Sequence, residues 1–295
     1  MKKVIGTIRL KKCFLVHTFG YFIVMQLQGM DKEKRIAVLI DADNVSEKYI
    51  KYILDEVSNH GIPTYRRIYG DWTKPHLSSW KNVLLNNSIS PVQQYGYTTG
   101  KNSTDSALII DAMDILYSGH VEGFCIVSSD SDFTRLATRL REAGMYVLGM
   151  GEQKTPKPFI VACEKFKYLE VLAVSSSNGK ENSENSETAE ASNGETSYNK
   201  EMKKDDIKGE NGMVAKKKLI KAIKDIIINT SDEDGWASLA DVGNILNKRF
   251  PDFDTRNYGH VKLTPLVSSL KVFDINSRKT SNPNITHKYI KIKES

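Results

Sequence analysis

Short apolar runs alternate with amphipathic segments over the first half of the chain. The run IAVLI at 36–40 is wholly apolar, which is typical of a strand buried on both faces of a sheet. The segment after it, 46–59, has apolar residues at helical spacing. The same alternation predicts strands at 63–70, 91–97, 123–129, 145–150 and 167–172, and helices at 76–87, 103–119 and 132–144. This alternation predicts an α/β fold with a parallel sheet covered by helices on both faces.

The chain changes character at residue 174. Residues 174–213 are almost free of large apolar side chains and cannot bury a core, so we expect a flexible polar linker. Apolar periodicity then returns and predicts a second, smaller α+β domain over 214–295. Its expected elements are helices at 216–228, 238–250 and 255–270 and strands at 272–275 and 287–293. Three helices closed by a short hairpin are the layout of a winged helix.

The net charge of +6 is concentrated at the two ends of the chain. Residues 31–173 hold 17 basic and 18 acidic residues, whereas residues 214–295 hold 15 basic and nine acidic residues. A basic C-terminal domain fits a polyanionic partner, although lysines that only keep a small domain in solution would give the same count. Cys13, Cys125 and Cys163 lie far apart without a CxxC pair, which argues against a disulfide framework or a structural zinc site. A reducing, cytoplasmic compartment is therefore expected.

The first 30 residues have a basic start and an apolar middle, as a signal peptide does. The apolar stretch at 13–25 is shorter than the ~20 residues that a membrane-spanning helix needs, and no small-residue cleavage site follows it. The sequence from Met30, MDKEKRIAVLIDADN, reads as an ordinary start that leads directly into the first strand. We therefore expect residues 1–33 to be a disordered or mis-annotated extension, with membrane anchoring as the alternative, and we expect no membrane partner.

Aspartates follow the predicted strands at one edge of the sheet. Asp41 ends the first strand, and Asp130 and Asp132 follow the strand GFCIVSS. Asp105 lies in the first turn of the helix after the third strand. Because sites in a doubly wound sheet form beyond the carboxyl ends of the strands, we expect these four carboxylates in one cleft. Unpaired, they would raise one another's pKa values.

Each aspartate also has a purely structural explanation. An Asp at a helix N-terminus accepts hydrogen bonds from unpaired amides and suits the helix dipole. Four such residues at one edge favour a site over capping alone. Asn44 either reaches back into the same cleft or caps the next helix. Asp71, after the second strand, is a candidate outer ligand or substrate contact.

A divalent cation would relieve the repulsion among these carboxylates. Mg²⁺ and Mn²⁺ take oxygen ligands and keep several waters. Such a cation polarises a phosphodiester, lowers the pKa of an attacking water and stabilises the leaving oxygen. The sequence therefore predicts a metal-dependent nuclease with Mg²⁺ or Mn²⁺ as cofactor and Asp41, Asp105, Asp130 and Asp132 as the metal ligands.

Four motifs within residues 34–172 together resemble the NYN domain family, relatives of PIN-domain ribonucleases. They are VLIDADN, YGDW, KNSTDSALIIDAMD and FCIVSSDSDFTRLATRLREAGMYVLGMG. The resemblance implies a PIN-like α/β fold over 34–173 and metal-dependent RNA processing. The residues that match the family's acidic site, and that we expect to be catalytic, are Asp41, Asp105, Asp130 and Asp132, with Asn44 at the motif's asparagine. Ser129 stands where many members have glycine, a departure that removes no ligand.

Residues 214–293 resemble an OST-HTH (LOTUS) domain through WASLADVGNILNKRFPDFDTRNYGHVKLTPLVSSL. The resemblance implies a winged helix that binds RNA or a protein partner. In that fold the third helix would face the nucleic acid, and lysines of the last strand would meet phosphates. The expected RNA-binding residues are Arg256, Tyr258, His260, Lys262, Lys288, Lys291 and Lys293, together with Lys101 of the first domain. Solvated surface charge is the alternative explanation for each lysine.

The leading hypothesis is thus a ribonuclease with a C-terminal RNA-binding domain, and two other functions fit the same residues. A non-catalytic RNA-binding regulator would keep the acidic pocket for a metal or another ligand. A haloacid-dehalogenase-type phosphatase would use Asp41 as nucleophile and Asp43 as acid. That family also needs a lysine shortly before its second acidic motif, and GHVEGFCIVSSDSDF has none.

Overall fold

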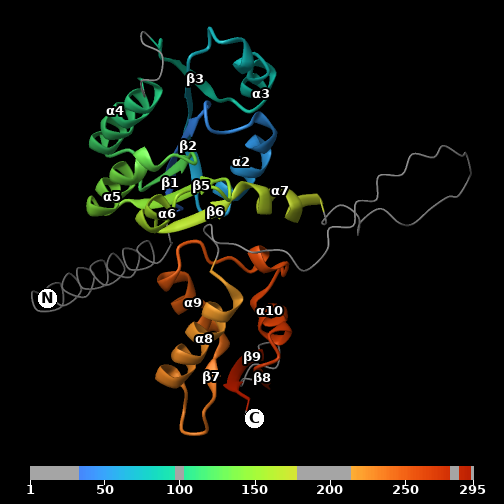
Figure 1. Ribbon diagram of the computed structural model, residues 1–295. Coiled ribbons are helices and arrows are strands. Elements are labelled where there is room, and N and C mark those ends of the chain that lie inside the picture. Colours follow the sequence, from blue (N-terminus) through green and yellow to red (C-terminus); the bar gives the residue numbers. More distant parts are fainter. Residues whose placement is uncertain (1–32, 97–102, 178–213, 280–285, 294–295) are drawn as a thin grey trace, which may run out of the picture. The chain divides into compact units, whose positions relative to one another are not determined.

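Six parallel strands form the sheet of the first domain, in the order β3-β2-β1-β4-β5-β6 (Figure 1). They are β1 (Arg35–Asp41), β2 (Ile62–Gly70), β3 (Ser90–Gln93), β4 (Gly123–Val127), β5 (Tyr146–Gly151) and β6 (Lys165–Tyr168). The strand order reverses between β1 and β4. A doubly wound sheet forms its crevice at the carboxyl ends of the strands at such a reversal.

This computed structural model describes residues 33–96, 103–177, 214–279 and 286–293. The expected N-terminal extension and linker fall almost entirely outside these ranges, as does Lys101. Among the described residues, no helix is both long and apolar enough to cross a membrane.

Helices cover both faces of the sheet. On one face lie α2 (Ile50–Ser58), α3 (Trp80–Asn86) and α7 (Leu169–Ser177), and on the other lie α4 (Ser103–Ser118), α5 (Thr134–Glu142) and α6 (Lys157–Ala162). Short 3₁₀ turns precede three of them: η1 (Glu47–Tyr49), η2 (Pro75–Leu77) and η3 (Ser131–Phe133). The predicted α/β architecture is confirmed.

The central strand shows why the sequence forms this layered fold. Side chains of a strand alternate between the two faces of its sheet. Accordingly, Ile36, Val38 and Ile40 belong to the core under α2, whereas Ala37 and Leu39 belong to the core under α4. All five are fully buried, which explains why this strand is apolar at every position rather than at every second one.

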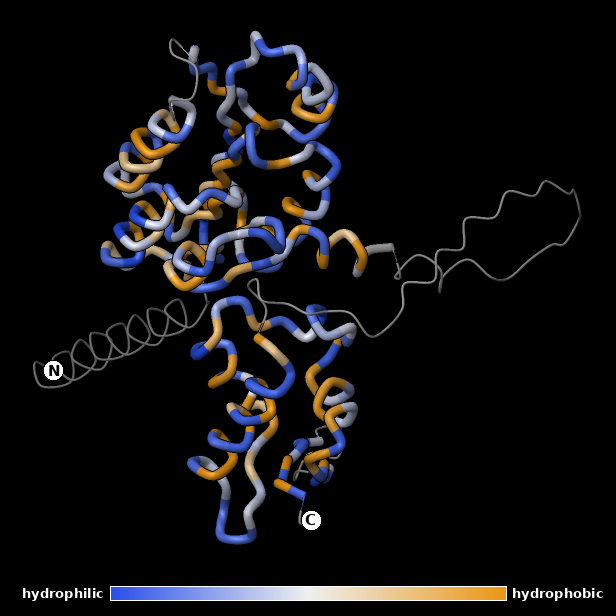
Figure 2. The backbone as a smooth tube through the Cα atoms, viewed as in Figure 1, coloured by the Kyte–Doolittle hydropathy of each residue, from blue (hydrophilic) through white to orange (hydrophobic). Residues whose placement is uncertain are grey.

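The C-terminal domain combines helices with a small antiparallel sheet. Its helices are α8 (Lys216–Thr230), α9 (Leu239–Arg249), η4 (Thr255–Tyr258) and α10 (Leu263–Ser269). Its strands β7 (Ala237–Ser238), β8 (Phe273–Lys279) and β9 (Thr286–Ile292) pair in the order β7-β9-β8. Figure 2 shows apolar and polar residues alternating along the helices, and the apolar ones form one core. The predicted small domain of helices and hairpin is confirmed.

Two predicted elements differ from the structure. The expected helix at 255–270 is broken into η4 and α10 by Gly259, whose φ of 79° lies in the left-handed region and ends the first turn. The expected strand at 167–172 stops at Tyr168, because Leu169 and Leu172 enter the core at helical spacing as the start of α7. Helix α6, which follows Pro156, was not predicted.

The segment Pro251–Arg256 of the C-terminal domain runs beside the edge strand β6. The amide of Phe166 donates a hydrogen bond of 2.8 Å to the carbonyl of Pro251. The hydroxyl of Tyr168 donates one of 3.2 Å to Asp252. These bonds use backbone and side-chain groups that an open sheet edge would leave to solvent. Residues from Arg35 onward form one structural unit.

Four charged residues, which we call the charge network, join the same two regions: Glu56, Lys167, Asp254 and Arg256. The guanidinium of Arg256 donates two hydrogen bonds of 3.1 Å to the Glu56 carboxylate and three, of 2.7, 3.0 and 3.2 Å, to Asp254. Lys167 contacts both carboxylates. Burial by itself raises the pKa of Glu56 and of Asp254. A hydrogen bond from His60, followed by Arg256 and Lys167, lowers the pKa of Glu56 below its usual value, and Arg256 and Lys167 do the same for Asp254.

Candidate metal centre

Asp41 lies at the carboxyl end of β1, where the strand order reverses. Its carboxylate is fully buried. It accepts hydrogen bonds from the Ser128 hydroxyl at 2.8 Å, the Asn44 side-chain amide at 2.8 Å and the Asp43 backbone amide at 3.0 Å. Burial raises the pKa of Asp41 above its usual value, and these three donors offset only part of that rise. Asn44 therefore reaches back to the strand end.

Asp130 and Asp132 occupy the loop between β4 and α5. The Asp130 carboxylate caps η3 by accepting a 2.9 Å hydrogen bond from the Asp132 amide. The Asp130 amide donates a 3.1 Å bond to the Ser128 hydroxyl. Ser128 thus fixes the loop to Asp41 of the neighbouring strand. Capping and a role in a site are compatible for Asp130, since a carboxylate has two oxygens with several acceptor positions.

Asp105 lies in the first turn of α4 and is half-buried. One carboxylate oxygen from each of Asp105, Asp130 and Asp132 can be chosen so that all three lie within 4.8 Å of one another. We call these three residues the acidic cluster. They come from two separate segments, the first turn of α4 and the loop after β4. The sequence-based expectation also placed Asp41 with them.

The pKa of Asp105 reflects the negative charge that its neighbours place around it. Partial burial raises the pKa of Asp105 to about 6, and the charges of Asp41, Asp130 and Asp132 raise it in the same direction. A carboxyl group with this pKa is partly protonated near neutral pH in the absence of a cation. A bound cation would reverse this shift, because it favours the ionised carboxylate.

The donor set fits a hard divalent cation. All donors of the acidic cluster are carboxylate oxygens, which Mg²⁺ and Mn²⁺ prefer, and Asp132 is exposed, so that water can complete the coordination. Asp41 is outside the acidic cluster, although its charge acts on Asp105. Asp71, which the sequence suggested as an outer ligand, instead accepts hydrogen bonds from neighbouring residues. Hydrogen bonds from Thr73 and Gln93 lower its pKa to about 2.

The expected RNA-binding residues are spread over the C-terminal domain. Arg256 belongs to the charge network, and the Tyr258 hydroxyl donates a 2.8 Å bond to the carbonyl of Val214. Contrary to the sequence-based expectation, neither lies on the last helix. His260 and Lys262 also precede α10, which begins at Leu263. Lys288, Lys291 and Lys293 lie on or just after β9, where alternation places Lys288 on the face opposite to the other two.

Ser128 is the site residue that the sequence did not single out. It is fully buried and links Asp41 to the Asp130 loop. The available signal was its position: a serine directly after an apolar strand, two residues before Asp130. Glu56 was likewise missed, because nothing in the α2 sequence separates a buried ion-pairing glutamate from an exposed one.

Two protein families match this chain. Residues 35–170 match the NYN domain family, and residues 215–285 match the OST-HTH/LOTUS domain family. A solved structure of a protein of unknown function from Vibrio parahaemolyticus is similar, with 18% identity and a TM-score of 0.39. The similarity covers 46% of this chain and 93% of that protein. No curated protein gives a significant match.

The NYN family consists of PIN-like nucleases, and OST-HTH domains bind RNA. Both matches fall on the domains described above: the first on the parallel sheet with the acidic cluster, the second on the basic helical domain. The chain therefore carries an NYN domain of the PIN-like nuclease type followed by an OST-HTH/LOTUS domain.

Proposed function

We propose that this protein is a metal-dependent ribonuclease that hydrolyses RNA phosphodiester bonds and holds its substrate with the C-terminal domain. The observation that carries the proposal is the acidic cluster, in which three carboxylates converge at the strand-order reversal of a nuclease-family domain. Capping alone explains one aspartate at a time, but it does not explain why their oxygens gather within 4.8 Å.

In this proposal Asp105, Asp130 and Asp132 hold Mg²⁺ or Mn²⁺. The bound cation supplies Lewis acidity: it polarises the phosphodiester and lowers the pKa of an attacking water. Asp41 adds a carboxylate beside the acidic cluster, and its three donors oppose the rise in pKa that burial causes. Asn44 and Ser128 are positioning residues, because they act through Asp41.

The RNA would be bound by basic residues, most of them in the C-terminal domain. The candidates are His260, Lys262, Lys288, Lys291 and Lys293, with Lys101 of the NYN domain. Arg256 is a weaker candidate than the sequence suggested, since Glu56 and Asp254 already occupy its guanidinium. Tyr258 likewise has a partner in the carbonyl of Val214.

The test is cleavage of labelled single-stranded and structured RNA with and without Mn²⁺. We expect wild-type protein to cut only with the metal and an Asp130→Asn, Asp132→Asn double variant to lose at least about a hundredfold in rate. The matched control is Asp114→Asn, an exposed aspartate on α4 outside the acidic cluster, which should cut normally. Equal cleavage by wild type and the double variant would refute the site.

Two alternatives correspond to other outcomes of the same experiment. Tight RNA binding without cleavage under any divalent ion would favour a non-catalytic RNA-binding regulator. Release of phosphate from a phosphomonoester, with a trapped aspartyl-phosphate on Asp41, would favour a haloacid-dehalogenase-type phosphatase.

A further inference from the structure

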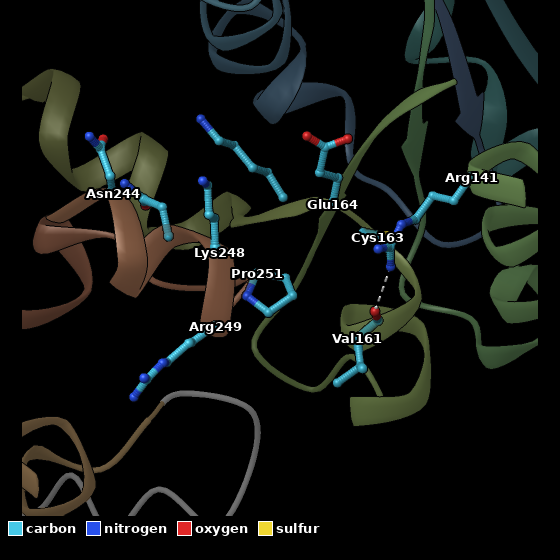
Figure 3. Close-up of a pocket in the computed structure, with 10 residues that line it drawn as sticks. Arg141, Val161, Cys163, Glu164, Asn244, Lys248, Arg249 and Pro251 are labelled. Carbon is cyan, nitrogen blue, oxygen red and sulfur yellow. Dashed lines mark hydrogen bonds between the residues drawn. The ribbon is translucent and has the colours of Figure 1, made fainter. Parts of the chain in front are cut away.

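A cavity of about 750 Å³ lies where α9 of the OST-HTH domain meets the entry to β6 of the NYN domain (Figure 3). We call it the α9–β6 cleft. Arg141, near the end of α5, and Lys165, the first residue of β6, line one wall. The last turns of α9 line the other with Asn244, Asn247, Lys248 and Arg249.

Hydrogen bonds and an ion pair next to the cleft hold its two walls together. The amide of Phe166, the residue after Lys165, donates to the carbonyl of Pro251, which follows α9. Two residues further along β6, Tyr168 bonds Asp252, and Lys167 pairs with Asp254. The cleft is therefore shaped by residues that are themselves held by hydrogen bonds and ion pairs.

The lining of the cleft carries a surplus of positive charge. It holds the four cations Arg141, Lys165, Lys248 and Arg249, against a single acid, Glu164. Over the part of the chain that the structure describes, none of these four cations forms an ion pair. Arg141 instead donates a 3.3 Å bond to the carbonyl of Val161 (Figure 3). It donates another of 3.3 Å to the carbonyl of Ala162. Burial, followed by the nearby charge of Lys167, lowers the pKa of Lys165.

Helix stability accounts for only part of this pattern. Lys248 and Arg249 in the last turn of α9 interact favourably with the helix dipole, and that alone is a sufficient reason for their presence. The dipole does not explain Lys165, which is half-buried at the start of a strand beside another lysine. An anion in the cleft would neutralise both walls at once.

The remaining lining indicates what kind of anion fits. Asn244, Asn247 and Lys248 are three and four residues apart, so they share one face of α9. Their amides offer neutral hydrogen bonds suited to ribose hydroxyls. Val161 and Pro251 add apolar surface of the kind that a sugar or base edge contacts. Cations, amides and apolar groups in one cleft match a nucleotide chain better than a small inorganic anion.

The cleft lies away from the acidic cluster. The residues that line the cleft include no member of the acidic cluster, and Arg141 lies near the end of α5 that is farther from the Asp130 loop. The nine residues of α5 span about 13 Å, at roughly 1.5 Å per residue. Lys165 is in register with Leu148 of β5, and through it with Cys125 in the middle of β4, but β6 lies two strands away from β4. A ligand in the cleft would be held without entering the site of cleavage.

We propose that the α9–β6 cleft binds the phosphodiester backbone of single-stranded RNA through Arg141, Lys165, Lys248 and Arg249, at a site separate from the acidic cluster. This inference rests on the proposed function, because it takes RNA as the ligand. It adds an RNA contact that the NYN and OST-HTH domains make jointly, rather than each on its own surface.

The experiment measures binding without cleavage, so that its outcome does not depend on nuclease activity. Fluorescein-labelled single-stranded RNA is titrated by fluorescence anisotropy into full-length protein without divalent metal, at several salt concentrations. The variants are Lys248→Ala with Arg249→Ala for one wall, and Lys165→Gln for the other. The matched control is Lys51→Ala with Lys81→Ala, two exposed lysines on α2 and α3.

We expect each wall variant to weaken binding at least several-fold, and Lys165→Arg to retain it. A plot of the logarithm of the association constant against the logarithm of the salt concentration has a negative slope. For the α9 double variant this slope should become less steep by about 1.4, at about 0.7 per lost phosphate contact with a single strand. Circular dichroism and the melting temperature verify that the variants are folded.

Three results would overturn the proposal. One is wild-type affinity in both wall variants. Another is loss in the α9 variant alone, which would assign binding to the helix surface and not to the cleft. The third is that inorganic tripolyphosphate displaces the RNA when its concentration is no higher than the Kd of the RNA. The ligand of the cleft would then be a small polyanion. If RNA binds the cleft but is never cut, the proposed function fails while this inference stands.

Discussion

The hydroxyl of Ser128 lies 2.8 Å from the Asp41 carboxylate and donates a hydrogen bond to it. The same oxygen accepts a bond from the amide of Asp130. One fully buried serine thus joins the end of β1 to the loop after β4, the two strands between which the sheet order reverses. The relation connects a buried carboxylate to the loop that carries two residues of the acidic cluster.

Replacing Ser128 by alanine should impair the site more than the fold. The change removes one of three donors from a buried carboxylate, so we expect the pKa of Asp41 to rise and the protein to lose about 1–3 kcal/mol of stability. Cleavage should fall about 10–100-fold, with a higher Mn²⁺ concentration at half-maximal rate. Asn44→Ala should act in the same direction, because Asn44 is another of the three donors.

Ser58→Ala is the control for this prediction, since Ser58 is exposed and bonds only to the carbonyl of Leu54 in its own helix. RNA cleavage is measured across a Mn²⁺ titration, and the melting temperature is followed alongside. A Ser128→Ala protein that melts earlier but keeps the wild-type Mn²⁺ midpoint would reduce Ser128 to a purely structural role.

Breaking the charge network should be costly. Arg256→Ala leaves the buried Glu56 without its bidentate partner, which we expect to lower the free energy of unfolding by about 3–5 kcal/mol. Arg135→Ala removes an exposed pair with Glu142 at 3.9 Å and should cost at most about 1 kcal/mol. Urea denaturation of both variants compares the two values. Equal losses would show that the network contributes no more than a surface pair.

The charge network also predicts a dependence of stability on pH. The pKa values of Glu56 and Asp254 are lower in the folded protein than the ~4.3 and ~3.9 of unfolded chains. Their stabilising contribution is therefore fully present above about pH 5 and is lost as the pH falls through the folded-state values. Glu56→Gln should be much less stable than wild type at pH 6, and the difference should shrink towards pH 3. If the difference in unfolding free energy between Glu56→Gln and wild type stayed constant from pH 6 to pH 3, a lowered pKa of Glu56 would be contradicted.

Much of the fold was predictable from local patterns. The apolar run 36–40 of β1 and the apolar strand β4 indicated a sheet buried on both faces, and helical periodicity marked α4 and α5. The break at Gly259 and the start of α7 at Leu169 could not be predicted, because both depend on how the chain packs after it folds. At such places the same residues suit more than one local structure.

The acidic cluster was predictable because it follows from topology. The carboxyl ends of parallel strands meet at one edge, so residues after successive strands are brought together whatever their separation in sequence. The charge network follows no such rule. Arg256 and Glu56 are 200 residues apart, and the sequence shows Arg256 only as one cation among many in a basic domain. Its pairing reduces the number of cations available for RNA.

The most direct test of the account is the location of the cation itself. A crystal of the full-length protein soaked in MnCl₂ is measured at a wavelength where manganese scatters anomalously. The account predicts an anomalous peak bound by Asp105, Asp130 and Asp132, present in wild type and in Asp114→Asn but absent from Asp130→Asn, Asp132→Asn. A saturating soak that leaves no peak among these carboxylates, or an unchanged peak in the double variant, would contradict it.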